Sequence, residues 1–425
     1  MKSALILRRK SIERNMKALK ESNQGIGTLL AFAIIPISGF ALDVYIPSLP
    51  DMAAKLHTDQ SSVQLTLSIF LITYGLGQLL IGGILDSYGR YLPNLVGLAG
   101  FIVTSIVIAN TGSLYVIYAM RALQGIAAAI VIVSKRAFFF DLYTGEKLKS
   151  FASLFSVIWA SAPIIAPFLG GYLQTHFGWQ SNFYFLALFG LVFFILELIF
   201  SGETLKVRSS FNYKTIGKTY WSMLRASDFT AGLLILGLSY GMLMVYNMAS
   251  PFIIETLLHY PPTVTGNCSL LSGLAVLAGG TISKIFISRP LFKKMLLSIG
   301  LQIIVAITLM VVTFRTQSLY TLMAYVILLH SLAGFIFNGM LAYCMTRFSH
   351  HGGLANGLAG GGYIIFTSAL SYGVVSSITI SSQFWLGVAY SVLIAGVLIL
   401  VLRVKWRDKA EVANPKAEPA MVLSE

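Results

Sequence analysis

The stretch IGTLLAFAIIPISGFALDVYIP, residues 26–47, is apolar for long enough to cross a lipid bilayer and contains one charged side chain, Asp43. Inserting a carboxylate into a membrane costs about 2.5–3.5 kcal/mol, so its presence needs a physical reason. Asp43 is therefore the first candidate functional residue. Segments of similar length and hydropathy recur along the sequence, and they decide the fold.

The composition places the chain among membrane proteins. Of its 425 residues, 56% are hydrophobic and 11% are charged, and the mean hydropathy is +0.79. Soluble domains carry roughly 25% charged residues. We expect an all-α protein with twelve transmembrane helices, over approximately 26–47, 63–85, 92–110, 114–134, 150–173, 182–201, 229–250, 265–287, 290–313, 317–340, 353–376 and 382–404.

The positions of lysine and arginine predict the topology. With both termini in the cytoplasm, 27 of the 30 basic residues fall in cytoplasmic segments, whereas Lys55 and Arg315 fall outside and Arg121 lies within the fourth span. The net charge of +14 therefore indicates topology and not a nucleic-acid partner, because the basic residues punctuate the apolar segments. We expect a multi-pass protein of the cell membrane, the inner membrane in a bacterium.

Two six-helix bundles joined by a cytoplasmic connector are typical of secondary transporters. The expected parts are a basic N-terminal segment (1–25), an N-terminal bundle (26–201), a linker (202–228), a C-terminal bundle (229–404) and a cytoplasmic tail (405–425).

Within the linker, apolar residues recur every fourth position beside basic ones. Ile216, Tyr220 and Leu224 form this row. The pattern indicates a helix on an anionic membrane surface, with an ordinary polar loop as the alternative.

Three ionisable side chains stand out inside predicted spans: Asp43, Arg121 and Glu197. Asp43 and Arg121 fall at similar depths, roughly 6–10 Å below the outer boundary, so we expect them to face each other. An arginine favours the charged carboxyl, whereas a low dielectric favours the neutral one, and this balance makes a proton switch. A static pair is the alternative. Glu197, near the inner end of its span, is a second coupling candidate or an interfacial carboxylate.

Charges also gather at the cytoplasmic ends of the second and fourth spans. The sequence GGILDSYGR (82–90) contains Asp86, Gly89 and Arg90, and SKRAFFFDLYTGEK (134–147) contains Arg136 and Asp141. Opposite charges at neighbouring helix ends predict a cytoplasmic gate, with simple topology-fixing charges as the alternative.

The fifth span carries small residues and prolines at helical spacing. A helix face with small side chains permits close approach of another helix, and proline bends the axis. This predicts a hinge or sliding face formed by Ala162, Pro163, Ala166, Pro167, Gly170 and Gly171.

Aromatic and amide side chains inside the spans are candidates for a cavity that accepts hydrophobic compounds. Ordinary packing is the alternative for each. They are Tyr45, Tyr74, Trp159, Tyr246, Asn247, Phe337, Asn338 and Tyr363.

The sequence has no GxxxxGK[ST] loop and no soluble catalytic domain, so an ion gradient is the expected energy source and no enzymatic activity is expected. Histidines and cysteines show no ligand spacing, so we expect neither a cofactor nor a metal. The expected partners are a small-molecule substrate, protons and the lipid bilayer, and the expected state is a monomer.

These motifs together resemble the major facilitator superfamily, specifically its Bcr/CflA-type drug:proton antiporter branch. The resemblance rests on LDVYIPSLP (42–50), GGILDSYGR (82–90), RALQG (121–125), APIIAPFLGG (162–171), FGWQSNF (177–183), GETL (202–205) and SPFI (250–253).

The resemblance implies two bundles that rock around a central cavity. It implies that Asp43 accepts a proton or cation with Arg121 as its partner. It further assigns the gate to Asp86, Gly89 and Arg90, and an antiporter helix to the fifth span. The chain departs from the pattern at Ser87 and Tyr91, where the family usually has basic residues.

The expected function is proton-coupled efflux of small amphipathic compounds, a multidrug antiport. Export of a specific metabolite, such as a siderophore, amino acid or sugar, is the alternative within the same mechanism. A non-transporting receptor or sensor is the alternative of another class, although a sensor usually adds a soluble domain.

Overall fold

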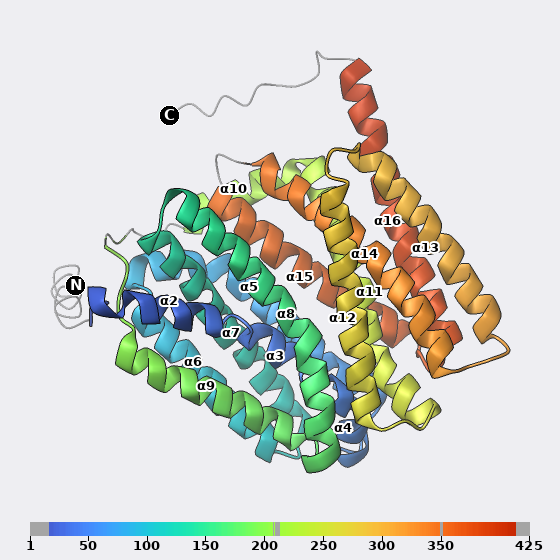
Figure 1. The fold of residues 1–425 in the computed structure, drawn as a ribbon, viewed down its shortest axis with the longest axis horizontal. Coiled ribbons are helices and arrows are strands. Elements are labelled where there is room, and N and C mark those ends of the chain that lie inside the picture. Colours follow the sequence, from blue (N-terminus) through green and yellow to red (C-terminus); the bar gives the residue numbers. More distant parts are fainter. Residues whose placement is uncertain (1–16, 207, 209–212, 349–351, 414–425) are drawn as a thin grey trace.

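The computed structural model describes residues 17–206, 208, 213–348 and 352–413, and it is helical almost throughout (Figure 1). The first half of the chain contains η1 (Glu21–Asn23), α2 (Gln24–Ala33), α3 (Ile37–Asp43), η2 (Ile46–Ser48), α4 (Leu49–Lys55), α5 (Gln60–Tyr88), α6 (Tyr91–Asn110), α7 (Leu114–Leu142), α8 (Gly145–Phe177) and α9 (Gln180–Phe200). The second half contains α10 (Tyr213–Arg225), α11 (Ser227–Pro251), the π-helix η3 (Phe252–Leu257), α12 (Pro262–Ile285), α13 (Leu291–Thr313), α14 (Leu319–Arg347), α15 (Gly352–Ser377) and α16 (Gln383–Ala413).

The prediction of an all-α fold with twelve spans is confirmed. Within the described residues, 12 helical segments are long and apolar enough to cross a membrane. Several helices outlast their apolar segment, because hydropathy marks the lipid-facing length and not the helix itself. The fourth span, expected to end at 134, continues to Leu142, so Lys135 and Arg136 lie inside α7 and not in a loop.

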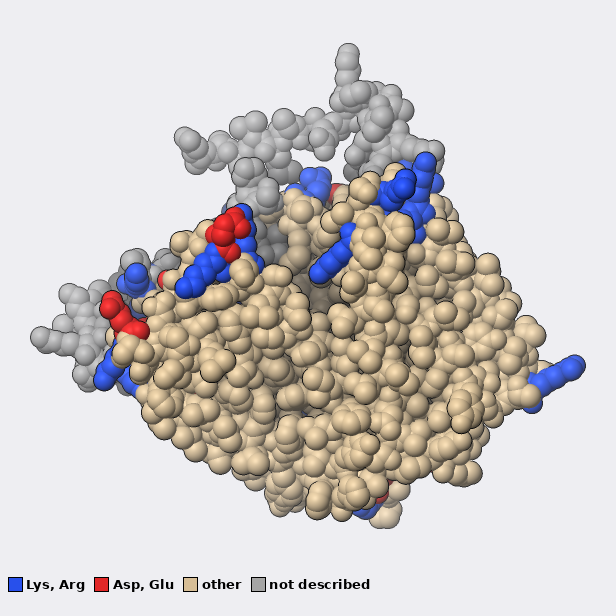
Figure 2. Space-filling view, viewed as in Figure 1, with Lys and Arg blue, Asp and Glu red and all other residues tan. Residues whose placement is uncertain are grey.

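Twelve crossings return the chain to its starting side, so the start of α2 and the end of α16 lie at the same end of the bundle. We call this the basic end, because Arg90, Lys147 and Arg289 lie there, and Figure 2 shows lysines and arginines gathered along it. The opposite end carries Lys55 and Arg315.

The first span is broken into short pieces. Pro36 precedes α3 and Pro47 lies in η2, and a proline removes one backbone donor and clashes with the preceding turn. Helix α3 therefore stops at Asp43, which leaves carbonyl groups near its end without helical partners. The break places Asp43 at a helix terminus inside the bundle.

The two halves meet mainly along α8 with α12 and along α5 with α15. Glycines permit this approach: a Cβ on Gly171 would lie 2.6 Å from the carbonyl oxygen of Pro262, and a Cβ on Gly361 would lie 2.7 Å from that of Gly75. Figure 1 shows α8 and α12 nearest each other toward α4 and separating toward the basic end.

A helix does form in the connector, as α10, although residues 207 and 209–212 of that segment lie outside the described part. Its packing differs from the expected membrane-surface arrangement. The hydroxyl of Tyr220 donates to the carbonyl of Leu79 at 3.2 Å, and Met223 is buried. Trp221 and Leu224 remain exposed. One face of α10 therefore packs on the bundle and another is free to contact lipid.

We expect Gly170→Ala to lower the unfolding temperature of the purified protein, because the new methyl group would overlap the carbonyl of Val44. Overpacking of this kind costs about 1–3 kcal/mol or more. The matched control is Gly300→Ala in α13, where a Cβ meets nothing within 4 Å. Thermal unfolding in detergent measures both, and equal unfolding temperatures would contradict the packing at Gly170.

Candidate functional site

Asp43 lies inside a narrow pocket that both halves of the molecule line. Its side chain is 0% exposed. Besides Asp43, the pocket is lined by Ser38, Gly39, Leu42, Phe70, Leu71, Tyr74, Trp159 and Pro163 from the first half, and by Tyr240 and Ile364 from the second. The carboxyl group therefore faces the protein interior and not the lipid.

The carboxyl group of Asp43 has one direct polar contact. The Asn247 side-chain amide donates to Oδ1 at 3.3 Å, and Oδ2 has no hydrogen-bond partner among the described residues. Burying a polar oxygen without a partner is costly, and burying an unpaired charge is more so. Because Asn247 belongs to α11, the state of this carboxyl group bears on a contact between the two halves.

Arg121 is buried beside the same segment, and its Nε and Nη1 have acceptors, whereas Nη2 has no hydrogen-bond partner among the described residues. Nε donates to the Thr66 carbonyl at 3.2 Å, and Nη1 donates to the Ala41 carbonyl at 2.9 Å and to Gln124 Oε1 at 2.6 Å. The guanidinium also lies over two aromatic rings, 4.8 Å from the centroid of Tyr45 and 4.3 Å from that of Phe70.

The expected direct pairing of Asp43 with Arg121 differs from this geometry. The ion pairs recorded among the described residues do not include these two side chains. Arg121 instead binds the carbonyl of Ala41, which becomes available because α3 ends two residues later. The arginine thus fixes the backbone that carries Asp43, and its charge acts on the carboxyl group without contact.

The expected cavity residues separate into two groups. Tyr74 and Trp159 line the pocket with Asp43, and Asn247 touches the carboxyl group itself. Phe337 and Tyr363 pack around Tyr240, with Tyr240 and Tyr363 5.8 Å apart between ring centroids. These side chains form an aromatic wall on the side of the second half.

The other expected cavity residues serve packing within one half. The Tyr45 hydroxyl hydrogen-bonds with that of Thr66 at 2.9 Å, and the Tyr246 ring lies 5.3 Å from the ring of His330. Asn338 lies against Gly280 of α12.

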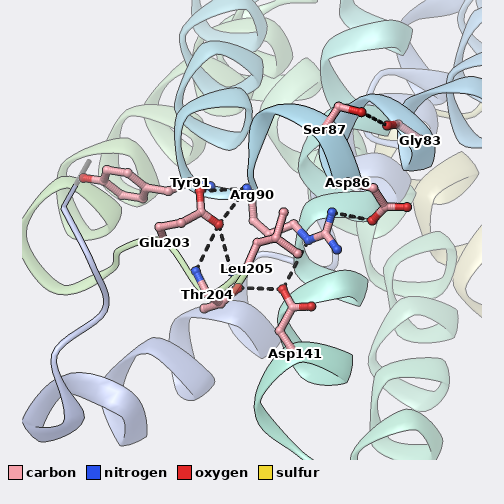
Figure 3. A network of polar contacts seen from close by, with 9 residues as sticks. All are labelled: Gly83, Asp86, Ser87, Arg90, Tyr91, Asp141, Glu203, Thr204 and Leu205. Carbon is pink, nitrogen blue, oxygen red and sulfur yellow. Dashed lines mark hydrogen bonds and ion pairs between the residues drawn. The ribbon is translucent and has the colours of Figure 1, made fainter. Parts of the chain in front are cut away.

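A charge network joins the ends of α5, α6 and α7 at the basic end (Figure 3). Arg90 pairs with Asp86 at 2.7 Å and with Asp141 at 3.2 Å. Gly89, with φ of +99°, makes the turn that a residue with a Cβ rarely adopts. Burial alone would lower the pKa of the Arg90 guanidinium, but the two carboxylates together raise it above its usual value.

The carboxylate of Glu203, for which no role was expected, completes this network. It accepts from the backbone N–H of Arg90 at 2.9 Å and of Tyr91 at 3.3 Å, which caps the start of α6 (Figure 3). It also accepts from the N–H groups of Thr204 and Leu205. The Thr204 hydroxyl donates to Asp141 at 2.8 Å. The GETL motif, residues 202–205, was the sequence feature that could have identified Glu203.

Arg136, which we expected beside Asp141, takes no part in this network. Its half-buried guanidinium lies 5.5 Å from the ring centroid of Phe155 on α8. Phe155 precedes Trp159, which lines the pocket with Asp43, by one turn of α8. Asp141 uses Arg90 and Thr204 instead.

Glu197 pairs with Lys135, which was expected to lie in a loop. Lys135 Nζ lies 2.6 Å from its Oε2, and the Asn94 amide donates to the same oxygen at 3.2 Å. Both charges are buried between α6, α7 and α9. Glu197 does not line the pocket that contains Asp43.

The small residues of α8 are divided between two packing surfaces. Ala162 lies against Gly39 and Gly170 against Val44, so this row faces the segment that carries Asp43. Gly171 lies against Pro262, and the carbonyl of Pro167 lies against Gly266 of α12, so that row faces the other half. Ala166 is fully buried, and Pro163 lines the pocket.

A buried histidine in the second half, His330, was likewise expected to have no role. His330 hydrogen-bonds through Nδ1 with the Ser272 hydroxyl at 2.7 Å and through Nε2 with the Tyr390 hydroxyl at 2.9 Å. The group ties α12, α14 and α16 together. Its signal in the sequence was a lone ionisable side chain in the tenth span.

Comparison with known proteins decides the family. The model of the Major Facilitator Superfamily matches residues 31–365. The chain belongs to this superfamily. An uncharacterized MFS-type transporter of Bacillus subtilis, YdgK, is 30% identical over 75% of this chain and 81% of its own length.

Another relative is the multidrug resistance protein D of Escherichia coli. It is 34% identical, over 37% of this chain and 40% of its own length. The crystal structure of a mutant of the nucleoside transporter NupG shares the fold, with a TM-score of 0.66, 12% identity, and coverage of 90% of this chain and 99% of that one. The chain is therefore a multi-pass membrane transporter and not an enzyme, and the expected resemblance to drug-exporting members is confirmed.

We expect Glu203→Ala to loosen the start of α6, because several backbone N–H groups lose their acceptor. Losing a helix cap costs roughly 0.5–2 kcal/mol. Hydrogen exchange at the amides of Arg90 and Tyr91 should become faster, whereas Glu146→Ala, which removes an exposed pair with Lys149, should leave them unchanged. Unchanged exchange in Glu203→Ala would contradict the capping role.

We expect Lys135→Met to destabilise the protein by about 3–5 kcal/mol, because it leaves the Glu197 charge buried without its cation. The double variant Lys135→Met/Glu197→Met should recover much of this loss, since an apolar pair of similar volume replaces the ion pair. Thermal unfolding measures both. Lys149→Met, in an exposed pair, is the control, and a single variant as stable as the parent would show that the pair contributes little.

Proposed function

We propose that the protein exports small amphipathic organic compounds in exchange for protons, by alternating access of the central pocket to the two sides of the membrane. The supporting observation is the position of Asp43: a buried carboxyl group, in a pocket lined by both halves, held by a side chain of the opposite half. A group at such a place can exchange a proton only when the halves move.

Contacts between the halves near Asp43 keep this conformation closed toward the opposite end. The Gln64 amide of α5 donates to the carbonyl of Met248 at 2.7 Å, and α8 and α12 touch backbone to backbone at Gly171 and Gly266. Toward the basic end α8 and α12 diverge (Figure 1), and Figure 2 shows the surface hollowed there. We propose that this conformation gives the pocket access to the basic end.

In the proposed cycle, the deprotonated carboxylate attracts a substrate from the basic end. After the halves rock, proton entry from the opposite side neutralises Asp43 and releases the substrate. Arg121 keeps its backbone contacts throughout, so it holds the segment while the carboxyl group changes state. Each net charge that crosses the membrane is driven by about 2.3 kcal/mol per 100 mV.

We propose that the charge network at the basic end acts as a gate by making the first half rigid. The partners of Arg90 and Glu203 come from α5, α6, α7 and the residues just after α9, all within the first half. The network therefore ties that half into one body which moves as a unit. We propose that the basic end faces the cytoplasm, since positive residues are retained on that side, and that the membrane is the bacterial inner membrane.

Export of one specific metabolite is the second candidate function within this mechanism. The aromatic side chains that line the pocket, Tyr74, Trp159 and Tyr240, favour flat hydrophobic ligands over sugars. Efflux of a panel of dyes and of metabolites, with and without an uncoupler, separates the two candidates.

We expect Asp43→Asn to abolish substrate accumulation driven by a pH gradient, because an amide cannot carry the proton. The measurement is ethidium uptake into inverted membrane vesicles with an imposed pH gradient. Asp59→Asn is the matched control: Asp59 is exposed and caps α5, and asparagine caps a helix equally well. Gradient-driven uptake at the parental rate in Asp43→Asn would refute this proton site.

A further inference from the structure

Arg136 differs from the other interior cations of the first half in lacking a partner. Arg121 donates to carbonyl and amide oxygens, Lys135 pairs with Glu197, and Arg90 pairs with Asp86 and Asp141. No hydrogen bond or ion pair to Arg136 is recorded within the described residues, and its recorded contact is with the ring of Phe155. A guanidinium in this setting keeps its donors available for an anion.

The position of Arg136 connects it with the central pocket. Its guanidinium lies over the ring of Phe155, which precedes Trp159 by one turn of α8. Trp159 lines the pocket that contains Asp43. Arg136 therefore lies beside the pocket, on the side of the basic end, whereas Asp43 lies toward the opposite end.

The spacing of the two charges follows from helix geometry. Pro163 lines the pocket with Asp43, and Phe155, over which the Arg136 guanidinium lies, is eight residues earlier on α8, roughly 12 Å along the axis. Between these two levels lies Trp159, which lines the pocket together with Tyr74 and Tyr240. A ligand that uses both charges is elongated and aromatic, with groups of opposite charge on the order of 10 Å apart.

We propose that Arg136 is an anion-binding subsite of the transport pocket, and that the preferred substrates are zwitterionic aromatic compounds whose amine binds at Asp43 and whose carboxylate binds Arg136. This inference rests on the proposed export function and defines its substrate class. It also explains why a cation lies inside the bundle with no ion pair to a carboxylate among the residues that the structure describes.

The test compares two ligands that differ in one charge. Ciprofloxacin carries a carboxylate at one end and a secondary amine at the other, and its ethyl ester lacks the carboxylate. Binding to the full-length protein in detergent, followed by tryptophan fluorescence, is expected to favour the acid over the ester by about tenfold, because a charge-assisted hydrogen bond is lost in the ester. Equal affinities, or a preference for the ester, would overturn the proposal.

The variants separate recognition from folding. Arg136→Gln is expected to bring the ratio of the two affinities close to one, and Arg136→Lys, which keeps the charge, to retain much of it. Lys149→Gln removes an exposed cation at the same end of the molecule and should keep the full ratio. A ratio that survives in Arg136→Gln would overturn the assignment of the subsite to this residue.

Ethidium distinguishes this inference from the proposed function, because it is a permanent cation without an anionic group. If a pH gradient drives ethidium transport but the wild-type protein does not distinguish the acid from its ester, the export function stands and the anion subsite fails. If the wild-type protein prefers the acid but a pH gradient drives transport of neither compound, the subsite stands and the proton coupling fails.

Discussion

A charged group inside an apolar bundle must be satisfied by the protein itself, and Arg121 shows how this requirement shapes the first half. Its donors need carbonyl oxygens, which an intact helix does not offer. The break of the first span at Asp43 supplies one, the carbonyl of Ala41, and α5 supplies another at Thr66. The arginine and the broken helix therefore depend on each other, and together they hold the carboxyl group at the centre of the molecule.

The two halves contribute differently to the site. Four fully or almost fully buried charged side chains of the described residues belong to the first half: Asp43, Arg121, Lys135 and Glu197. The second half presents Asn247 and the aromatic wall around Tyr240, and its buried His330 is held by hydroxyl groups. Such an arrangement suits a first half that carries the charge and a second half that closes over it as a rigid body.

Hydropathy and the energetic cost of a charge in a membrane predicted the twelve spans and the position of Asp43 inside the bundle, because both follow from local composition. Contacts between distant segments do not follow from local composition. Lys135 looked like a loop cation because it directly follows an apolar segment, yet α7 continues past it and its partner lies 62 positions away. Glu203 accepts from backbone amides 112 and 113 residues away, which no local pattern indicates. Only three-dimensional packing reveals these pairs.

The two arginines of α7 illustrate why burial alone does not identify a binding residue. Arg121 is the more deeply buried, but carbonyl and amide oxygens and two aromatic rings already occupy its guanidinium, so a ligand there would have to displace contacts that hold the backbone. Arg136 is less buried, and its recorded contact among the described residues is with the ring of Phe155. A substrate gains most from a charge that the protein has left unpaired, because no existing hydrogen bond is broken when it binds. We therefore propose that Arg121, which holds the backbone through Nε and Nη1, maintains the site, and that Arg136 selects what enters it.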